Sequence, residues 1–430
     1  MKTIRISRRD FMGKALAGSA LLMAYPWLNT MADKSSTDNS KKVKVGIIGV
    51  GSRGSLLLHF LNELSEEINI EVAAVCDNYE PHYQRAIKNT GGKAKAFYDY
   101  RKLIDIPDID AVVIAVPLHE HAHITIDSLN AGKHVFCEKA MARHLEDVKQ
   151  MADTFNNTGK VLQIGHQRMF DPRYLKAVEL INAGEIGKIT QIRAFWHRNS
   201  DWRRPLPEGR PDLERKINWR LYREYSCGLM TELASHQIQV ANWFKGKTPV
   251  SVMGKGSINY WKDGREVYDN VALIYSYDDG TQFIYDSMTS NRHYGLEEQI
   301  MGDEGTLEME VNRRYWEHPP PKPEPPPPPG IVQLMKDIEG GIFSDAIPLT
   351  NSSWIPELKV EGEGQKIVKR EKGFQESKVQ LEGFIASVRK GEPTKGLFEQ
   401  GYWATVWALL GQKAMDEQRI VELPDELKLT

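Results

Sequence analysis

The sequence predicts an α/β protein in which a doubly wound parallel sheet is followed by a second α/β domain with an open, largely antiparallel sheet. Two observations predict the first sheet: a glycine-rich turn between a strand pattern and a helix pattern, and a repeated alternation of short apolar runs with helical periodicity. A third predicts the second sheet, because short strands alternate with turn signals such as "YDDG" and "DEG" from residue 250 to about residue 310. We expect the first domain at residues 43–163 and the second at residues 164–430.

The first strand and helix enclose a glycine motif. Lys44 to Ile48 is a β-branched apolar run, and helical periodicity begins at Ser55. The turn between them reads G-x-G-x-x-G, with Gly49, Gly51 and Gly54. In such a turn the first glycine permits a tight bend, the second lets the backbone approach a pyrophosphate, and the third lets the helix pack on the strand. The motif in this context predicts a Rossmann dinucleotide site.

An acidic residue at the end of the next strand bears on the choice of cofactor. The run "EVAAVCD" ends at Asp77, about 20 residues after the motif, where a carboxylate accepts hydrogen bonds from the ribose hydroxyls of NAD. Ser52 and Arg53 lie in the glycine turn, close to the helix N-terminus that binds phosphates. A 2′-phosphate beside Asp77 would be repelled, which favours NAD, whereas Arg53 could pair with a phosphate and keeps NADP open.

The alternation continues with strands at 111–116 and 134–137 and a helix at 119–130. Ligands of doubly wound sheets bind outside the carboxyl ends of the strands. We therefore expect the residues that follow these two strands near the nicotinamide, and the candidates are Pro117, His121, Glu138 and Lys139. The histidines of "HEHAH" lack further ligands at suitable spacing, so we predict no metal site.

These motifs together carry a family resemblance. The glycine turn, "VPLHEHAH", "AGKHVFCEKAM" and "GLMTELASHQIQVANW" resemble the glucose–fructose oxidoreductase / inositol dehydrogenase / MocA family over residues 42–310. The resemblance implies a Rossmann domain, a C-terminal domain with an open antiparallel sheet, and NAD(P)-dependent oxidation or reduction of sugars or polyols. The E-K-P of the family appears here as Glu138-Lys139-Ala140, and the family's acid and histidine appear as Glu232 and His236, with Glu where many relatives have Asp.

The residues themselves suggest a base for this chemistry. "CGLMTELASHQIQVANWF" predicts a helix on which Glu232 and His236, four residues apart, share one face. A carboxylate beside an imidazole would raise its basicity, although a surface pair without a catalytic role has the same spacing. With the resemblance, His236 is expected to act as base in oxidation and acid in reduction, and Lys139 to polarise the same oxygen. The two could exchange roles.

Substrate recognition is expected from residues that follow the first domain. Gln167 is a further cofactor candidate at a strand end. Tryptophan, arginine and tyrosine are frequent in "AFWHRNSDWRRP" and "INWRLYREYSCG", and aromatic faces with planar donors suit sugars. The substrate candidates are Arg168, Trp196, His197, Trp202, Tyr222 and Arg223.

The N-terminus predicts export. "SRRDFMGK" before an apolar run of about fourteen residues resembles a twin-arginine signal and is too short to span a bilayer. We expect a signal peptide at residues 1–32, a linker at 33–42, the twin-arginine export machinery as a partner, the periplasm as destination and no membrane insertion after cleavage. The twin-arginine route carries folded proteins, often with a cofactor already bound.

Composition excludes other classes of function. Net charge is −2, and removal of the basic signal leaves the chain more acidic, which argues against nucleic-acid binding. Three cysteines do not form a disulfide scaffold. The "EHPPPKPEPPPPPG" run, residues 317–330, predicts an extended segment that either wraps a neighbouring subunit or lies on the surface. The resemblance implies a homo-oligomer, a dimer or a tetramer.

Three functions remain open at this point. The first is an NAD(P)-dependent oxidoreductase that acts on a sugar or glycoside and recycles a tightly bound cofactor, because an exported enzyme has no free nucleotide pool. The second is an NAD-dependent glycoside hydrolase that works through a transient keto-sugar and elimination. The third is a non-catalytic sugar-binding protein.

Overall fold

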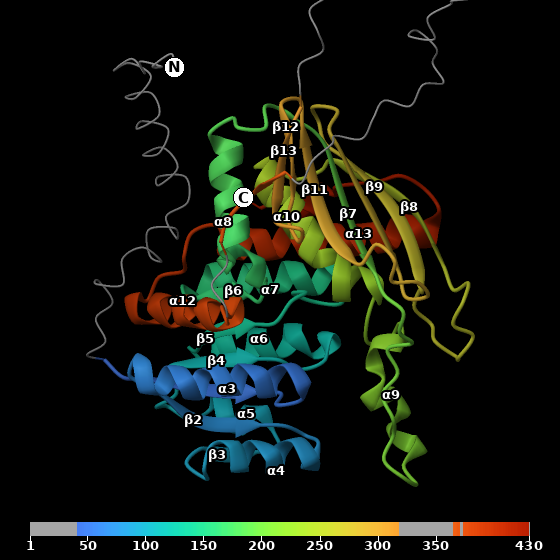
Figure 1. Cartoon of the computed structure of the whole chain (residues 1–430). Helices are drawn as coiled ribbons and strands as arrows, with labels where there is room; N and C mark the ends of the chain where they lie inside the picture. Colours follow the sequence, from blue (N-terminus) through green and yellow to red (C-terminus); the bar gives the residue numbers. More distant parts are fainter. Residues whose placement is uncertain (1–40, 318–363, 370–372, 430) are drawn as a thin grey trace, which may run out of the picture.

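The computed structural model describes residues 41–317, 364–369 and 373–429. The predicted signal peptide and nearly all of the predicted proline-rich segment therefore lie outside the described residues. Figure 1 shows two layers, with the N-terminal sheet and its helices below and a second sheet above.

The N-terminal layer is a parallel sheet of six strands in the order β3-β2-β1-β4-β5-β6. The order reverses beside β1, so the carboxyl ends of β1 and β4 flank the position at which such sheets bind ligands. Its strands are β1 (Val43–Ile48), β2 (Ile70–Cys76), β3 (Lys95–Phe97), β4 (Ala111–Ile114), β5 (His134–Cys137) and β6 (Leu162–Ile164). Its helices are α3 (Ser52–Glu67), α4 (Glu80–Asn89), α5 (Tyr100–Ile104), α6 (His121–Asn130) and α7 (Leu145–Thr158).

The upper layer is a sheet of nine strands in the order β14-β13-β12-β11-β7-β10-β9-β8-β15. Neighbours are antiparallel except β7 and β10, which are parallel. The strands are β7 (Ile189–His197), β8 (Ser251–Ser257), β9 (Asn270–Ser276), β10 (Gln282–Met288), β11 (Leu296–Gly302), β12 (Gly305–Glu308), β13 (Arg313–Trp316), β14 (Gln365–Lys366) and β15 (Val421–Glu422). The predicted fold class is confirmed for both domains.

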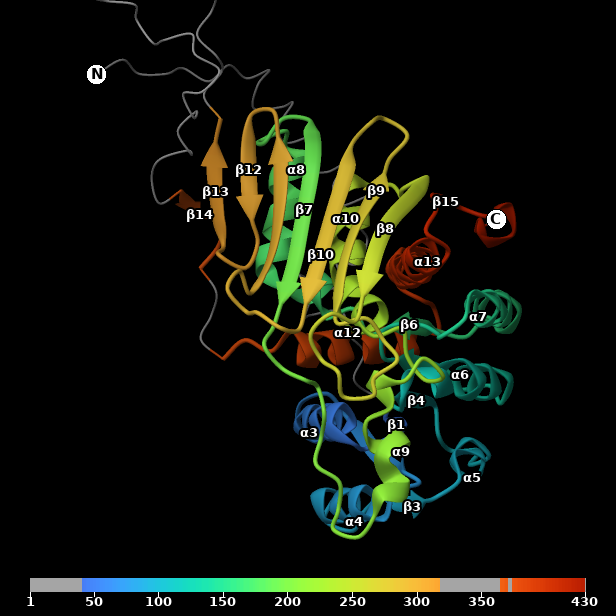
Figure 2. The same cartoon turned by 90° about the vertical axis from the view of Figure 1, so that its right-hand side faces the viewer.

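Helices cover one face of the upper sheet. In Figure 2 α8 (Pro172–Asn182) and α10 (Ser235–Lys245) lie behind the strands, and α13 (Leu397–Glu417) lies beside β8. The alternation of β10 follows from this arrangement, because Phe283, Tyr285 and Ser287 are buried while the residues between them are partly exposed. Helix α10 thus packs against β7 and α13, and α13 in turn contacts β6 and α7 of the Rossmann layer.

The last part of the chain returns to the N-terminal layer. Helix α12 (Glu376–Lys390) packs Leu381, Phe384 and Ile385 into the same apolar core as the first strand and α3. Lys378 Nζ lies 2.6 Å from Glu67 Oε1 on α3. The Rossmann layer is therefore completed by residues that follow the upper sheet in sequence. Within the described residues, no helix combines the length and apolarity needed to cross a membrane.

Candidate active site

The glycine turn has the geometry that a dinucleotide site requires. Gly49 has a φ of +84°, a left-handed conformation that favours glycine. A Cβ on Gly54 would lie 1.9 Å from the carbonyl oxygen of Gly49, so a side chain there would separate α3 from β1. A Cβ on Gly51 would meet only the ring of His82, at 3.2 Å. The packing of the fold therefore does not by itself require a glycine at position 51. The space that Gly51 leaves suits the approach of a phosphate.

Asp77 is fixed at the end of β2. Its carboxylate accepts hydrogen bonds from the main-chain N–H groups of Val50 and Tyr79, both at 2.9 Å, and lies 3.3 Å from His82 Nδ1. Burial raises the pKa of Asp77, but the His82 contact and the two N–H donors lower it further, so the net pKa lies below its usual value. The ionised carboxylate stands beside the glycine turn, as ribose recognition requires. These residues fit NAD.

Arg53, in the first turn of α3, points to the neighbouring strand end. Its Nε lies 2.6 Å from Glu138 Oε1, and its Nη1 donates to Ser377 Oγ at 3.1 Å. Ser52, the first residue of α3, is exposed. The guanidinium thus joins the phosphate-binding turn to the turn that carries Lys139.

Lys139 is held at the carboxyl end of β5. Its ammonium donates hydrogen bonds to the main-chain carbonyls of Glu232 at 2.8 Å and Thr231 at 3.3 Å. Burial lowers its pKa below 10.5, and the nearby carboxylates of Glu232 and Glu138 only partly offset this. The following peptide bond, Lys139–Ala140, is cis. Lys139 therefore links the Rossmann layer to the segment that precedes α10.

His236 lies in the first turn of α10 and is buried. Two rings flank it: His166 meets it edge-on with ring centroids 5.8 Å apart, and Trp196 lies at the same separation with the planes tilted by 52°. Burial, with the charges of Lys139 and Arg168, lowers the pKa of His236 well below 6.5. A neutral imidazole can accept a proton, so the ring is in the state that a general base needs.

Comparison with known proteins identifies the family. Residues 43–166 match the model of an oxidoreductase family with an NAD-binding Rossmann fold, and residues 174–308 match the GFO/IDH/MocA C-terminal domain. The chain belongs to the GFO/IDH/MocA family. Its N-terminal domain is an NAD-binding Rossmann domain.

Two inositol dehydrogenases are among its relatives. Inositol 2-dehydrogenase of Salmonella typhimurium is 35% identical over 148 residues, which are 34% of this chain and 43% of that enzyme. The match thus spans less than half of the Salmonella enzyme. Myo-inositol 2-dehydrogenase of Thermotoga maritima is 24% identical over 385 residues, 89% of this chain and 99% of that enzyme.

A solved structure shares the fold. Levoglucosan dehydrogenase in complex with NADH and levoglucosan aligns with a TM-score of 0.68 and 20% identity, covering 90% of this chain and all of that one. The comparisons support an NAD-dependent oxidoreductase related to sugar and inositol dehydrogenases.

One expectation for this GFO/IDH/MocA protein is wrong. Glu232 does not pair with His236, because residues Met230–Ala234 form a π-helical turn and four residues no longer bring two side chains together as in an α-helix. The Glu232 carboxylate instead lies 2.8 Å from Arg220 Nε and accepts from Ser226 Oγ at 3.3 Å. Burial raises the pKa of Glu232, but Arg220 and Lys139 hold it below its usual value. The basicity of His236 is accordingly lowered, not raised as the spacing suggested.

The turn after β4 is organised by His121. Its Nδ1 lies 2.7 Å from the carbonyl oxygen of Ala140 and its Nε2 lies 3.0 Å from that of Val116. A neutral ring donates to only one of them, and burial lowers the pKa of His121. The ring thus joins the turns after β4 and β5, beside Pro117. Among the described residues, no group of three or more His, Cys, Asp or Glu side chains could hold a metal ion.

The predicted substrate residues divide between two faces of the upper sheet. Arg168 is buried, lies 3.0 Å from Glu298 Oε1 and stands 5.6 Å from the Trp196 ring, on the side of His236. His197 follows Trp196 on β7 and therefore faces the opposite side, where it pairs with Asp286. Gln167 opens the 3₁₀ turn η2 (Gln167–Phe170) after β6. Arg168 and Trp196 are thus gathered near His236, and His197 is not.

The remaining three candidates lie in the connection from β7 to α10. Trp202 is partly buried and has a φ of +61°. Tyr222 donates to Glu214 at 2.7 Å, and Arg223 binds Asp416 at 2.8 Å and 3.0 Å. The polar groups of Tyr222 and Arg223 are engaged within the C-terminal domain.

Two site residues were given no specific role from the sequence, although His166 stands beside Gln167 and Arg168 at the same strand end. His166 is buried, and within the described structure neither ring nitrogen has a hydrogen-bond partner of good geometry. Burial, Lys139 and Arg168 lower its pKa to about 3. The sequence feature that could have identified His166 as a site residue is its position just after β6. Arg220 had none, because its pairing with Glu232 depends on the path of the connection.

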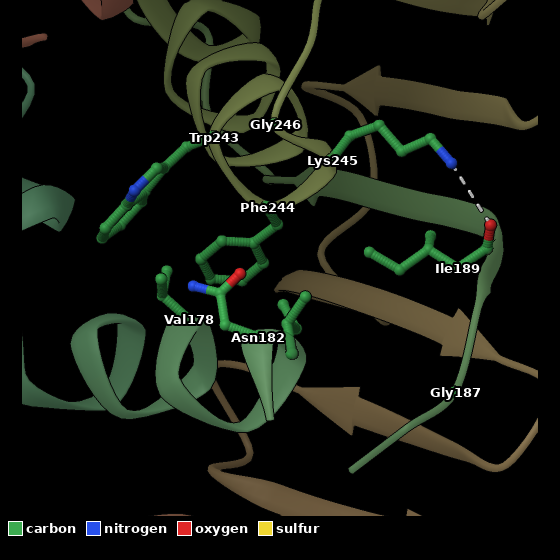
Figure 3. A pocket seen from close by; sticks show the side chains of 9 residues that line it. Val178, Asn182, Gly187, Ile189, Trp243, Phe244, Lys245 and Gly246 are labelled. Carbon is green, nitrogen blue, oxygen red and sulfur yellow. Dashed lines mark hydrogen bonds between the residues drawn. The ribbon is translucent and has the colours of Figure 1, made fainter. Parts of the chain in front are cut away.

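A separate hollow of about 240 Å³ lies at the other end of α10 (Figure 3). Apolar side chains of α8 and α10 line it, and Lys245 at its rim is paired with Asp279 at 2.8 Å. His236 lies in the first turn of α10 and Lys245 ends the helix, so the hollow is distinct from the cofactor edge.

Proposed function

We propose that this protein is an exported oxidoreductase that oxidises or reduces a hydroxyl or carbonyl carbon of a sugar, polyol or glycoside with tightly bound, recycled NAD. The observation that carries the proposal is the pair of buried rings of His166 and His236, with centroids 5.8 Å apart. Lys139, after β5 of the Rossmann sheet, is near enough for its charge to lower the pKa of both rings. NAD, when bound, supplies the acceptor or donor of hydride. Relatives named as inositol and levoglucosan dehydrogenases support the substrate class.

The chain's own groups have separable roles in this proposal. His236, kept neutral by burial, takes the hydroxyl proton in oxidation and returns it in reduction. Lys139 donates a hydrogen bond to the same substrate oxygen and stabilises the charge that develops there. Glu232 keeps its carboxylate on Arg220, so it positions the chain around Lys139 and does not touch the imidazole.

Export supports the recycling of the cofactor. The twin-arginine resemblance predicts that the folded protein crosses to the periplasm with NAD already bound. A homo-oligomer is proposed with it, because large side chains are exposed at the open face of the upper sheet. Met253 on β8 is 49% exposed, and Tyr294, in the connection before β11, is 68% exposed while its ring lies against Phe195 and His197.

The test begins with the protein purified from a periplasmic extract. The nucleotide released by denaturation is identified by mass, and the holoprotein is then mixed with inositols, aldoses and nitrophenyl glycosides without added nucleotide. We expect bound NAD and a single-turnover rise in absorbance near 340 nm with at least one polyol or sugar. Release of nitrophenol would indicate net hydrolysis instead. A protein that binds no nucleotide would overturn the proposal.

A further inference from the structure

The chain between β7 and α10 crosses the edge of the Rossmann sheet. We call residues 198–226 the bridging segment; it includes the 3₁₀ turn η3 (Pro211–Leu213), helix α9 (Glu214–Ile217) and the 3₁₀ turn η4 (Trp219–Leu221). In both Figure 1 and Figure 2 the bridging segment, in which α9 is labelled, extends from the upper layer along the Rossmann layer to the level of α4. We propose that the bridging segment forms an outer wall of the NAD site and slows release of the cofactor, with Lys216 closing the adenosine end. This deepens the proposed function, in which NAD is recycled without leaving.

The bridging segment contacts the adenosine end directly. The ammonium of Lys216 donates a hydrogen bond to the carbonyl of Asn78 at 3.1 Å and lies 5.8 Å from the centroid of the Tyr79 ring. Asn78 and Tyr79 follow Asp77, whose carboxylate accepts the Tyr79 N–H. Asp77 is the acid expected to bind the ribose in this fold, so Lys216 reaches the turn beside the expected ribose position.

The same segment contacts the nicotinamide end. The ring of Tyr225 lies 4.6 Å from that of His119, in the turn after β4. Arg220 pairs with Glu232, and the Glu232 carbonyl holds the ammonium of Lys139 after β5. The contacts therefore fall at the carboxyl ends of β2, β4 and β5, and β1, which lies between β2 and β4, carries the glycine turn. A dinucleotide on that turn would lie between the sheet edge and the bridging segment.

Internal contacts keep the bridging segment closed on itself. The carboxylate of Glu214 accepts hydrogen bonds from Asn218 at 3.0 Å and Tyr222 at 2.7 Å. It also pairs with Arg203, so it joins the descending limb of the segment, before Pro211, to the returning limb, which starts at Glu214. Prolines fix the backbone between the limbs, at Pro205, Pro207 and Pro211. Glu214 is thus the shared acceptor that gives the segment one shape.

The base of the bridging segment is tied to the upper domain. Arg203 donates to the carbonyl of Asp263 at 2.9 Å, and Arg265 donates to the carbonyl of Asp201 at 2.7 Å. Arg223 binds Asp416 on α13. Both ends of the bridging segment are thus anchored to the upper domain. NAD can leave past this wall only when several of these contacts break and the segment moves away from the Rossmann layer.

The test measures dissociation of NADH from the holoprotein. The protein is loaded with NADH, excess NAD⁺ is added in a stopped-flow mixer, and the loss of bound-NADH fluorescence is followed for wild type, Glu214→Ala, Lys216→Ala and Glu224→Ala. Loss of a hydrogen bond to a charged group predicts release about tenfold faster in Glu214→Ala and Lys216→Ala. Glu224 is exposed in the same segment, and its ion pair within the described part of the chain is with Arg215, so Glu224→Ala is the matched control and is expected to release NADH at the wild-type rate.

Each outcome decides the inference. Lys216 is exposed, so its truncation leaves the core intact, and circular dichroism with thermal melting identifies any folding defect in Glu214→Ala. Wild-type release completed within the mixing time, or unchanged rates in folded Glu214→Ala and Lys216→Ala, overturns the wall while the oxidoreductase proposal stands. Failure of the wild-type protein to bind NADH overturns both.

Discussion

The ammonium of Lys139 donates a 2.8 Å hydrogen bond to the main-chain carbonyl of Glu232, across the boundary between the two domains. The carboxylate of the same glutamate is turned away to Arg220. One residue thus holds the lysine through its backbone and a neighbouring arginine through its side chain. Substitutions at Lys139 and Glu232 should therefore have different effects.

Replacement of Lys139 by methionine tests its role at the substrate oxygen. The variant keeps the length of the side chain and removes the donor, so we expect kcat to fall by about 10²–10³-fold, as for other groups that stabilise developing charge. NADH binding, followed by fluorescence, should change little. Lys149→Met on the exposed face of α7 is the control. Unchanged turnover in Lys139→Met would remove the lysine from the mechanism.

The pH dependence of oxidation tests His236. Burial and the cations of Lys139 and Arg168 lower its pKa well below 6.5. A base acts only when unprotonated, so the rate falls as pH falls through that lowered pKa, and the acid limb of kcat/KM should lie below pH 6.5. In Lys139→Met the limb should move toward higher pH, because a repelling charge is gone. A limb above pH 7 in the wild-type protein would contradict this assignment.

The glycine turn and the strand ends were predictable because they depend on local sequence. Gly49 and Gly54 are required by contacts within one strand–turn–helix unit, and Lys139 is the second residue after β5. The predicted strand at 134–137 agrees with β5.

The partners of Glu232 could not be predicted in this way. A π-helical turn leaves no mark in apolar periodicity, and the Arg220 contact depends on tertiary structure. His166 was visible as a strand-end residue, but its ring faces His236 only because the end of β6 lies near the first turn of α10. The contact of Lys216 with Asn78 likewise joins residues far apart in sequence.

Replacement of Glu232 by glutamine tests its positioning role. The change keeps the shape of the side chain and removes the negative charge that pairs with Arg220. We therefore expect the free energy of unfolding to fall by about 1.5–3 kcal/mol. Since the Glu232 charge also raises the pKa of Lys139, that pKa should fall further in the variant. Denaturant unfolding measures the first effect, and the basic limb of the pH profile measures the second. Glu224→Gln provides an exposed control, and equal stability of Glu232→Gln and wild type would show that the Arg220 pair is not structural.

Substitution of Gly54 should affect mainly the stability of the fold, and substitution of Gly51 mainly the binding of the cofactor. In Gly54→Ala the new Cβ would meet the Gly49 carbonyl at 1.9 Å, so α3 must move and stability should fall by about 3 kcal/mol. In Gly51→Ala the Cβ meets only the edge of the His82 ring, and stability should change by about 1 kcal/mol or less. NADH affinity should nevertheless fall about tenfold or more in Gly51→Ala, because the methyl group occupies the space that the pyrophosphate approaches. Thermal melting of the apoprotein and fluorescence titration with NADH check both variants. Wild-type NADH affinity in Gly51→Ala would mean that the phosphates do not approach the turn at this residue.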